Sequence, residues 1–533
     1  MHRNFSDGVI LLVIGIVVIL FLAWDLFMTT ENSFNCKMFK ICYRNVFQKH
    51  RSYWNILLGI LFLCFFIGYT FYNAFGKGKA QKENLIGISG LLFYIIVSLL
   101  VSVAPHRVNW RPVIWGFALQ FVFAVFVLHT HPGYVVFDYI GTKIAEFIAF
   151  AANGTEFVFG TEIIGNFGFG VLPIIIYFSM MTSMLYYVGF LPYIIRKISW
   201  LFTVTCGTTG PESMATAGNM FLGMTESPLL IRPHLAHLTN SEIVAIMTAG
   251  FASIAGSVMG AYISFGVNPT HLLTATVMSA PAALAIAKLI HPELQKSKYA
   301  KGAVAETAPM AAANIIEAAA LGITDSIPLV ANIAAILIGF VALQYFLDAM
   351  LGWLGHCVGH GDWSFDLLLS YIFYPFVLVM GVDIDEVLLA SKLVGQKTFF
   401  NEFIAFISLR DQIKLREDGG CRCDVNDNIQ WLGERSESLV TYALCGFSNF
   451  ASIGIMIGAM TALAPTRAKV FSALAVRALI GGTIACLCTG CVVSILYIDR
   501  EKPFMWGDVD LNNCEFVGPN SCLISCNGTV IDC

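Results

Sequence analysis

The chain has 533 residues, of which 57% are hydrophobic and only 12% are charged, and its mean hydropathy is +0.73. Soluble globular proteins carry about 25% charged residues, so this composition excludes a soluble fold and indicates a polytopic, all-α membrane protein. The net charge of −4, from 31 Lys and Arg against 35 Asp and Glu, offers no basic surface for nucleic acid.

Ten apolar stretches are predicted to cross the membrane, because a spanning helix needs roughly 20 apolar residues. In chain order they cover 8–29, 54–75, 84–104, 113–130, 171–192, 243–266, 271–290, 327–352, 439–463 and 470–498. Gly, Pro, Glu or Asn interrupts three further stretches, at 206–231, 365–381 and 384–408. The first run lacks a small-residue cleavage site, so we interpret it as a span and not as a cleaved signal peptide.

Positive charge orients these spans, because cytoplasmic loops are enriched in Lys and Arg. The basic connections lie at 36–52, 106–111, 196–197, 296–301 and 467–469. All five are cytoplasmic if 206–231 and 384–408 each enter and leave the membrane on the same side. Both termini are then extracellular, and so are the glycosylation sequons at Asn4, Asn153 and Asn527. Lys77, Lys79 and Lys82 form a discordant cluster in a predicted outer loop.

Most of the 15 cysteines lie in apolar runs, where a thiol acts as a small hydrophobe. The polar tail holds four others, Cys514, Cys522, Cys526 and Cys533. We expect them to form disulfides outside the cell, with all three pairings open. Cys421 and Cys423 have no second pair and no nearby His, so no zinc-type metal site is predicted there.

Two segments of the second half resemble each other. Residues 248–264 and 443–462 both contain Gly-Phe, then Ala-Ser-Ile, then a Gly-Ala pair. An interrupted stretch precedes each, bearing Glu226 in the first copy and Glu402 in the second. The charge pattern makes the copies cross in opposite directions, which predicts inverted repeats with broken helices and two re-entrant hairpins. The alternative is that Gly-, Ala- and Ser-rich membrane helices are alike by composition alone.

Several polar residues fall inside the predicted membrane region, where an ionisable side chain costs at least about 2.5 kcal/mol. The carboxylates are Glu212, Glu226 and Glu402, and non-helical backbone at this depth needs protein or water around it. A polar, partly hydrated cavity is therefore predicted. It would contain two of the carboxylates, together with Asn219, Thr225, Ser253, Asn401, Ser448, Asn449 and Ser452. It suits a neutral polar solute and a hard cation, and these residues alone do not name the solute.

Each of these residues also has an alternative, purely structural role. Asn219 and Asn449 could cap interrupted helices, and Ser448 and Ser452 could hydrogen-bond within their own helix. Phe447 could simply pack. Two more residues have structural interpretations only: Glu212 braces the first hairpin, and Arg232 snorkels at its exit.

Four segments closely resemble the concentrative nucleoside transporter family. They are GNMFLGMTESPLLIRPHL (218–235), MTAGFASIAGSVMGAYISFGV (247–267), KTFFNEFIAF (397–406) and YALCGFSNFASIGIMIGAMTALAP (442–465). The resemblance runs from about residue 85 to 498. It implies a plasma-membrane homotrimer of inverted-repeat protomers, each importing one nucleoside with a cation, usually sodium, and without an organic cofactor.

The resemblance also implies a division of roles. The nucleoside base would meet the first hairpin's tip and the following broken helix, at Met224, Thr225, Glu226 and Val258. The ribose would be held by Glu402, Asn449 and Ser452, with Phe447 beside them. Sodium would be bound by the side chains of Asn219, Thr225 and Ser253 and by the carbonyls of Leu222 and Ile254.

Two departures from the family pattern bear on these expectations. Many members have Gln where this chain has Met224, and Gly223-Met224 resembles the purine-preferring subtype. Ser257 beside Val258 mixes the purine and pyrimidine patterns, so we expect purine nucleosides such as adenosine and inosine to be preferred and uridine to be tolerated. Animal members usually carry a cytoplasmic tail and three extra helices before the core, and we expect this chain to begin at the second of those helices.

The expected organisation follows from these elements. It comprises extra helices (1–83), scaffold helices with an interfacial helix (84–200), the first repeat (201–300), a scaffold or oligomerisation helix (301–365), the second repeat (366–498) and the tail (499–533). Proton coupling through Glu226 or Glu402, broad nucleoside selectivity and transport of another small polar solute remain alternatives. An enzyme is not expected, because the hairpins hold no His and the chain has no GxSxG or HExxH motif. A receptor is not expected either, because its seven spans do not fit.

Overall fold

The computed structural model describes residues 66–70, 82–162, 167–299, 312–359, 363–418 and 429–497, and the backbone of three short strands in the tail. The predicted span 8–29, most of 54–75, the sequons at Asn4 and Asn527 and the side chains of the tail cysteines lie outside this description. Lys77, Lys79, Cys421 and Cys423 lie outside it as well.

The described chain is helical up to residue 497. Its first part contains η2 (Lys82–Leu85), α4 (Ile86–Leu100), η3 (Pro105–Arg107), α5 (Trp110–His129), α6 (His131–Phe159), α7 (Phe167–Gly170), α8 (Leu172–Tyr187) and α9 (Phe190–Thr205). The next part contains α10 (Gly210–Gly218), α11 (Ser227–Leu230), η4 (Arg232–His237), α12 (Asn240–Phe251), α13 (Gly256–Ser264) and α14 (Pro269–Ile290).

The remaining helices begin with the longest one, α15. They are α15 (Ile315–Val358), α16 (Phe365–Met380), η5 (Ile384–Glu386), α17 (Val387–Phe399), α18 (Glu402–Glu417), α19 (Glu434–Leu444), α20 (Phe450–Leu463), η6 (Pro465–Arg467) and α21 (Ala468–Leu496). The tail adds an antiparallel sheet in the order β1 (Cys514–Phe516), β2 (Leu523–Cys526), β3 (Thr529–Asp532), which the sequence interpretation did not include. The all-α prediction is confirmed for the membrane part.

Six described segments are long and apolar enough to cross a membrane. They are Trp110–His129, Gly168–Tyr187, Asn240–Ser264, Pro269–Ile290, Ile315–Val358 and Pro465–Leu496. The stretches predicted at 84–104 and 365–381 contain shorter apolar helices, α4 and α16. The count of ten spans stays a prediction.

Both helices predicted to be broken are broken. The stretch 243–266 divides into α12 and α13 around residues 252–255, and 439–463 divides into α19 and α20 around residues 445–449. The interrupted stretches form helix pairs as well, α10 with α11 and α17 with α18. Each break removes helical hydrogen bonds, so it leaves backbone groups available inside the molecule.

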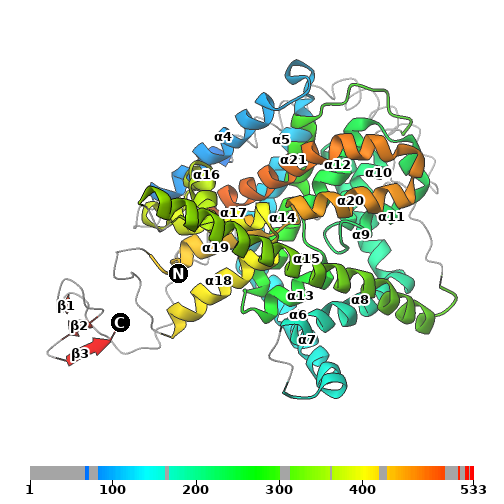
Figure 1. Cartoon of the computed structure of the whole chain (residues 1–533). Coiled ribbons are helices and arrows are strands. Elements are labelled where there is room, and N and C mark those ends of the chain that lie inside the picture. The colour runs from blue at the N-terminus through cyan, green and yellow to red at the C-terminus, as the bar shows by residue number, and fades with distance from the viewer. Residues whose placement is uncertain are drawn as a thin grey trace.

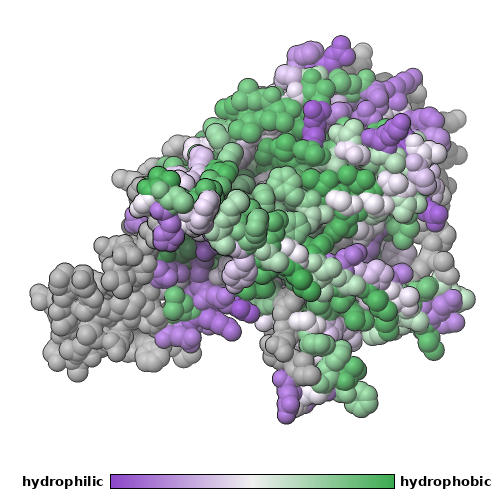
Figure 2. Space-filling model, viewed as in Figure 1, coloured by the Kyte–Doolittle hydropathy of each residue, from purple (hydrophilic) through white to green (hydrophobic). Residues whose placement is uncertain are grey.

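The core lies where α12, α14 and α21 pack on one another, and α19 packs on α21 as well. Nearly every residue of α12 and α14 is buried, and small residues allow the close approach. A Cβ on Gly482 would lie 2.5 Å from the Cβ of Phe251. By contrast, α15 runs diagonally across the front and packs on α8 (Figure 1). Hydrophobic residues cover the middle of this face (Figure 2), as expected for a lipid-facing or subunit-facing surface.

Candidate functional site

The two helix breaks meet inside the molecule. The backbone N–H of Phe447, in the second break, donates a hydrogen bond to the carbonyl oxygen of Ser253, in the first, at 3.2 Å. The thiol of Cys486 on α21 lies 3.2 Å from the carbonyl oxygen of Cys445 and 3.7 Å from that of Ala252. One buried thiol therefore contacts both breaks, and the two repeats are joined through their backbones.

This crossing depends on a residue without a side chain. A Cβ on Gly446 would lie 2.6 Å from Cys486 Sγ and 2.8 Å from the carbonyl oxygen of Phe251. Both distances are shorter than van der Waals contact, and one of the two neighbours is rigid backbone. Gly446 thus permits the two breaks to approach each other.

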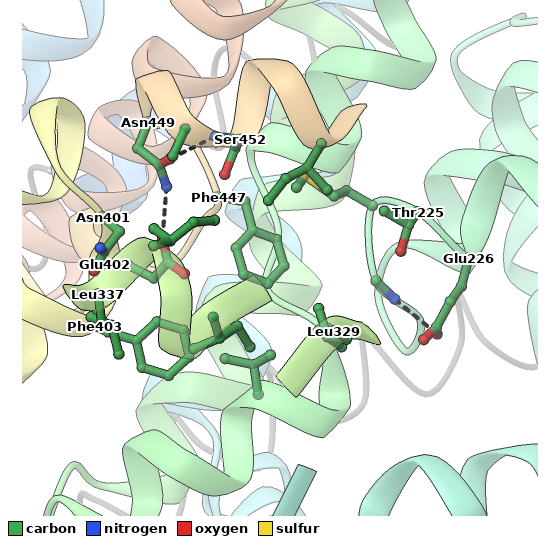
Figure 3. Close-up of a pocket in the computed structure, with 18 residues that line it drawn as sticks. Thr225, Glu226, Leu329, Leu337, Asn401, Glu402, Phe403, Phe447, Asn449 and Ser452 are labelled. Carbon is green, nitrogen blue, oxygen red and sulfur yellow. Dashed lines mark hydrogen bonds between the residues drawn. The ribbon is translucent and has the colours of Figure 1, made fainter. Parts of the chain in front are cut away.

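A cavity lies beside the crossing, between the tip of the first hairpin and the start of α18 (Figure 3). It holds about 620 Å³ of space between its side chains, part of it open to solvent. The eight residues expected to bind nucleoside all line it: Met224, Thr225, Glu226, Val258, Glu402, Phe447, Asn449 and Ser452. Residues more than 200 positions apart in the sequence therefore face one space.

One end of the cavity carries a buried carboxylate and amide pair. Asn449 Nδ2 donates to Glu402 Oε2 at 2.8 Å, and Asn449 Oδ1 accepts from the backbone N–H of Ser452 at 2.8 Å. The second contact caps α20, so the capping role considered for Asn449 is present together with the contact to the carboxylate. Asn401 caps α18 in the same way, by accepting from the N–H of Ile404 at 3.0 Å.

The other end of the cavity is the tip of the first hairpin. Glu226 Oε2 accepts from the backbone N–H of Gly223 at 3.3 Å, which folds the tip back on itself. Met224 is 6% exposed and presents a thioether, not an amide. The Phe447 ring lies between this tip and the Glu402 end (Figure 3). The cavity therefore has polar ends and an aromatic middle.

An apolar wall lines one part of the cavity, and sequence reasoning missed it. It is formed by residues of α15, namely Leu329, Ile333, Ile336 and Leu337. We expected α15 to serve only as scaffold or in oligomerisation. The segment 329–337 is apolar apart from Asn332, so its sequence gives no signal to separate residues that face the cavity from those that face outwards.

The residues expected to bind sodium come from two segments in contact. The carbonyl oxygen of Phe221, in the first hairpin's tip, accepts from the N–H of Gly256 at 3.3 Å, beside the first break. Asn219 ends α10 and is 1% exposed, and neither its side-chain oxygen nor its nitrogen has a hydrogen-bond partner among the described residues. The Ser253 hydroxyl bonds the carbonyl oxygen of Ala249 at 2.8 Å.

The unpartnered Asn219 amide and the oxygen donors near it indicate which kind of cation this place could bind. Buried polar atoms almost always have partners, so the unpartnered amide of Asn219 calls for an explanation that helix capping does not supply. Neutral oxygens from Asn, Thr, Ser and the backbone suit a hard cation. Within the described ranges, no group of three or more His, Cys, Asp or Glu could hold a metal ion. The donor set fits sodium better than a transition metal.

Other predicted polar residues have structural surroundings. Glu212 accepts from the N–H of Thr209 at 2.7 Å and pairs with Lys288 at 2.5 Å, so it braces the first hairpin as expected. Arg232 is exposed. Ser448 is buried, and its hydroxyl has no partner among the described residues, so it does not hydrogen-bond its own helix.

The buried lysines Lys288 and Lys397 were not singled out from the sequence. A search of the apolar stretches for basic residues would have found both, because Lys is rarely buried without a reason. Lys288 pairs with Glu212. Lys397 donates to the carbonyl oxygen of Ala443 at 3.1 Å.

Several titratable and charged side chains also lie just past the end of α14. His291 follows the helix and its Nδ1 lies 3.4 Å from a guanidinium nitrogen of Arg477. Burial, and then the positive charges of Arg477 and Lys288, lower the pKa of His291 to about 4. Burial raises the pKa of the neighbouring Glu293. The two shifts have opposite effects on how stability depends on pH.

Three family models match successive parts of the chain. They are described as Na+ dependent nucleoside transporter N-terminus (residues 89–162), Nucleoside recognition (168–268) and Na+ dependent nucleoside transporter C-terminus (271–494). Together they cover both hairpins, both breaks and every residue of the candidate site.

Known proteins resemble the chain over most of its length. Solute carrier family 28 member 3 of Mus musculus is 44% identical over 531 residues, which are 99% of this chain and 74% of the relative. Sodium/nucleoside cotransporter 1 of Mus musculus is 41% identical over 498 residues, with 93% and 76% covered. A solved structure of CNTnw in an inward-facing substrate-bound state is 30% identical with a TM-score of 0.71, with 77% of this chain and 97% of that chain covered.

Proposed function

The chain belongs to the sodium-dependent concentrative nucleoside transporter family, solute carrier family 28, a family of membrane transporters and not of enzymes; on this premise we propose that it imports nucleosides through the cavity between its two repeats. The observation that carries this proposal is the convergence of Met224, Glu226, Glu402 and Asn449 on one space. Sodium serves as the coupling ion, and the multi-pass protein acts in the plasma membrane as a homotrimer with both termini outside.

The ribose binds at the Glu402 end of the cavity. A carboxylate accepts hydrogen bonds from sugar hydroxyls, and an amide both donates and accepts. The 2.8 Å bond between Asn449 Nδ2 and Glu402 Oε2 orients both groups before the substrate arrives, which lowers the entropic cost of binding. Ser452 lies in the first turn of α20, next to this pair, and adds a hydroxyl.

The base binds between the first hairpin's tip and Val258, with Phe447 beside it. Met224 replaces a hydrogen-bonding side chain with a polarisable thioether, which favours the face of a larger bicyclic ring. The apolar wall from Leu329 to Leu337 adds contact area without demanding a hydrogen-bond pattern. We therefore propose that purine nucleosides such as adenosine and inosine are preferred and that uridine is tolerated.

Sodium binds where the tip meets the first break, through Asn219, Thr225 and Ser253 and the carbonyls of Leu222 and Ile254. The unpartnered amide of Asn219 supports this site. Thr225 belongs to both sites, and Phe447 N–H bonds the carbonyl oxygen of Ser253. A cation that orders the tip thereby orders the base site, which gives the two ligands a coupling free energy.

The test is uptake of labelled adenosine, inosine, uridine and thymidine by cells that lack nucleoside uptake and express this chain at their surface. Adenosine and inosine should accumulate fastest in sodium, uridine more slowly, and none of them in choline at constant pH. Absence of uptake of every nucleoside would overturn the proposal. Uptake in choline that rises on acidification would favour the second candidate, proton coupling through Glu226 or Glu402.

A further inference from the structure

Lys397 lies in the last turn of α17, on the first half of the second hairpin. It is 1% exposed and ranks among the largest fully buried side chains. Its ammonium donates to the carbonyl oxygen of Ala443 at 3.1 Å, and no carboxylate of the described residues lies within 4.0 Å of it. A buried, unpaired charge is expensive and is retained where it has a specific partner or role.

The carbonyl that Lys397 binds has lost its helical partner. In a continuous helix the N–H of residue 447 would bond the carbonyl oxygen of residue 443. Here the N–H of Phe447 bonds Ser253 across the crossing of the two breaks. The break therefore leaves the carbonyl oxygen of Ala443 without its helical hydrogen-bond donor. This oxygen lies at the negative end of the α19 dipole, where a cation is favoured.

The first repeat has no lysine at the equivalent end of its hairpin helix. Its hairpin helix α10 ends at Asn219, a neutral amide whose side-chain atoms have no described partner. The second hairpin helix α17 instead carries a lysine, Lys397, in its last turn. The cavity between the repeats holds one carboxylate from each, Glu226 and Glu402.

We propose that the Lys397 ammonium is a built-in cation that takes, in the second repeat, the place that sodium takes in the first. It binds the carbonyl end of α19, holds the second break in shape and balances the charge of Glu402 without an ion. The ribose end is then preformed in the absence of sodium, and only the base end needs the ion to become ordered. This inference rests on the proposed sodium and nucleoside sites.

The test compares Lys397→Arg, Lys397→Met and Lys397→Ser with wild type by surface-normalised adenosine uptake and by sodium activation curves. Lys397→Arg keeps the charge and should stay within about twofold of wild type in its adenosine KM. Lys397→Met should lose about tenfold or more in kcat/KM, as expected when a charged hydrogen bond is removed. Lys397→Ser leaves room for an ion, so its activation curve should become steeper and shift to higher sodium.

The matched control is Lys392→Met, on the same helix, where the lysine is 38% exposed and pairs with Asp366 at 3.1 Å. Its uptake and sodium activation should equal those of wild type. The proposal is overturned if Lys397→Met or Lys397→Ser keeps wild-type KM and sodium activation. If the neutral variants do not reach the surface, Lys397→Arg decides: activity near wild type supports a requirement for charge, and a loss of about tenfold refutes it.

A wild-type protein without sodium-dependent uptake would defeat the proposed function itself. Normal wild-type uptake with unaffected Lys397 variants would defeat only the role of Lys397.

Discussion

Asn449 Nδ2 donates to Glu402 Oε2 at 2.8 Å and joins the second hairpin to the second helix break. The same amide caps α20 through its oxygen. Because one side chain fixes both the helix end and the carboxylate, the geometry of the Glu402 end of the cavity, where we propose that ribose binds, depends on it directly. The partners are 47 positions apart in the sequence, so only the fold brings them together.

Replacing either member of this pair should reduce transport. Asn449→Ala removes the donor to Glu402 and the cap on α20, and Glu402→Gln removes the negative charge. Hydrogen bonds to charged groups contribute about 1.5–3 kcal/mol, so each variant should lose about tenfold to a hundredfold in kcat/KM for adenosine. Surface-normalised uptake measures the loss. The double variant should be no worse than the poorer single variant, and strictly additive losses would argue against a shared site.

Met224→Gln should widen selectivity towards pyrimidine nucleosides. A Gln amide can hydrogen-bond a base edge in two directions, whereas a thioether offers contact area only. The ratio of uridine to adenosine uptake should rise several-fold. Met259→Gln is the matched control, because Met259 is equally buried, at 5% exposed, but does not line the cavity. An unchanged ratio in Met224→Gln would show that this residue does not set selectivity.

Asn219→Ala should weaken sodium activation more than it weakens nucleoside binding at saturating sodium. The variant removes a proposed oxygen ligand of sodium, and a loss of about 1.4 kcal/mol in cation binding raises the half-activating sodium concentration about tenfold. Sodium titration of adenosine uptake measures this shift. Asn314→Ala serves as control, because Asn314 is exposed and only caps α15. A sodium curve identical to wild type would remove Asn219 from the ion site.

Gly446→Ala should abolish transport, because its Cβ would overlap Cys486 Sγ and the carbonyl oxygen of Phe251. Relief of the overlap requires the two breaks to move apart, and overpacking of this kind typically costs about 1–3 kcal/mol. Gly454→Ala on α20 is the control, since nothing lies within 4 Å of its added Cβ. The measurement is surface-normalised nucleoside uptake by both variants; Gly454→Ala should match wild type and Gly446→Ala should not. Wild-type uptake by Gly446→Ala would mean that the close crossing is not required.

Much of this architecture was predictable from the sequence, because breaks, hairpins and buried polar residues have local signatures. Gly-Phe with Ala-Ser-Ile marked both breaks, and Glu226 and Glu402 marked both hairpins. The wall from α15 was not predictable, since an apolar helix facing a cavity has the same composition as one facing lipid. The contacts of Cys486 with both breaks, and of Lys397 with Ala443, are set by long-range packing that no local pattern encodes.

Acid should destabilise the protein partly through His291. Its pKa falls from the ordinary 6.5 to about 4 in the folded state. Between these values the unfolded chain binds the extra proton, so stability is present above about pH 6.5 and is lost as the pH falls towards 4. The raised pKa of Glu293 acts in the opposite direction.

His291→Gln should therefore show a smaller drop in Tm than wild type between about pH 7.5 and about pH 5. The purified protein in detergent is suitable for this measurement. His106→Gln, at an exposed histidine, is the control and should behave as wild type. An equal acid-induced drop in His291→Gln and wild type would show that His291 does not contribute.

The central claim is that the proposed sodium and nucleoside sites share Thr225 and are energetically linked near the crossing of the two breaks. Its most direct test is equilibrium binding of labelled adenosine to the purified protein across a sodium titration, for wild type, Glu402→Gln and Asn219→Ala. Adenosine should bind wild type more tightly as sodium rises, Glu402→Gln weakly at every sodium concentration, and Asn219→Ala tightly only at higher sodium. Binding that is independent of sodium in wild type, or unchanged in Glu402→Gln, would contradict the account.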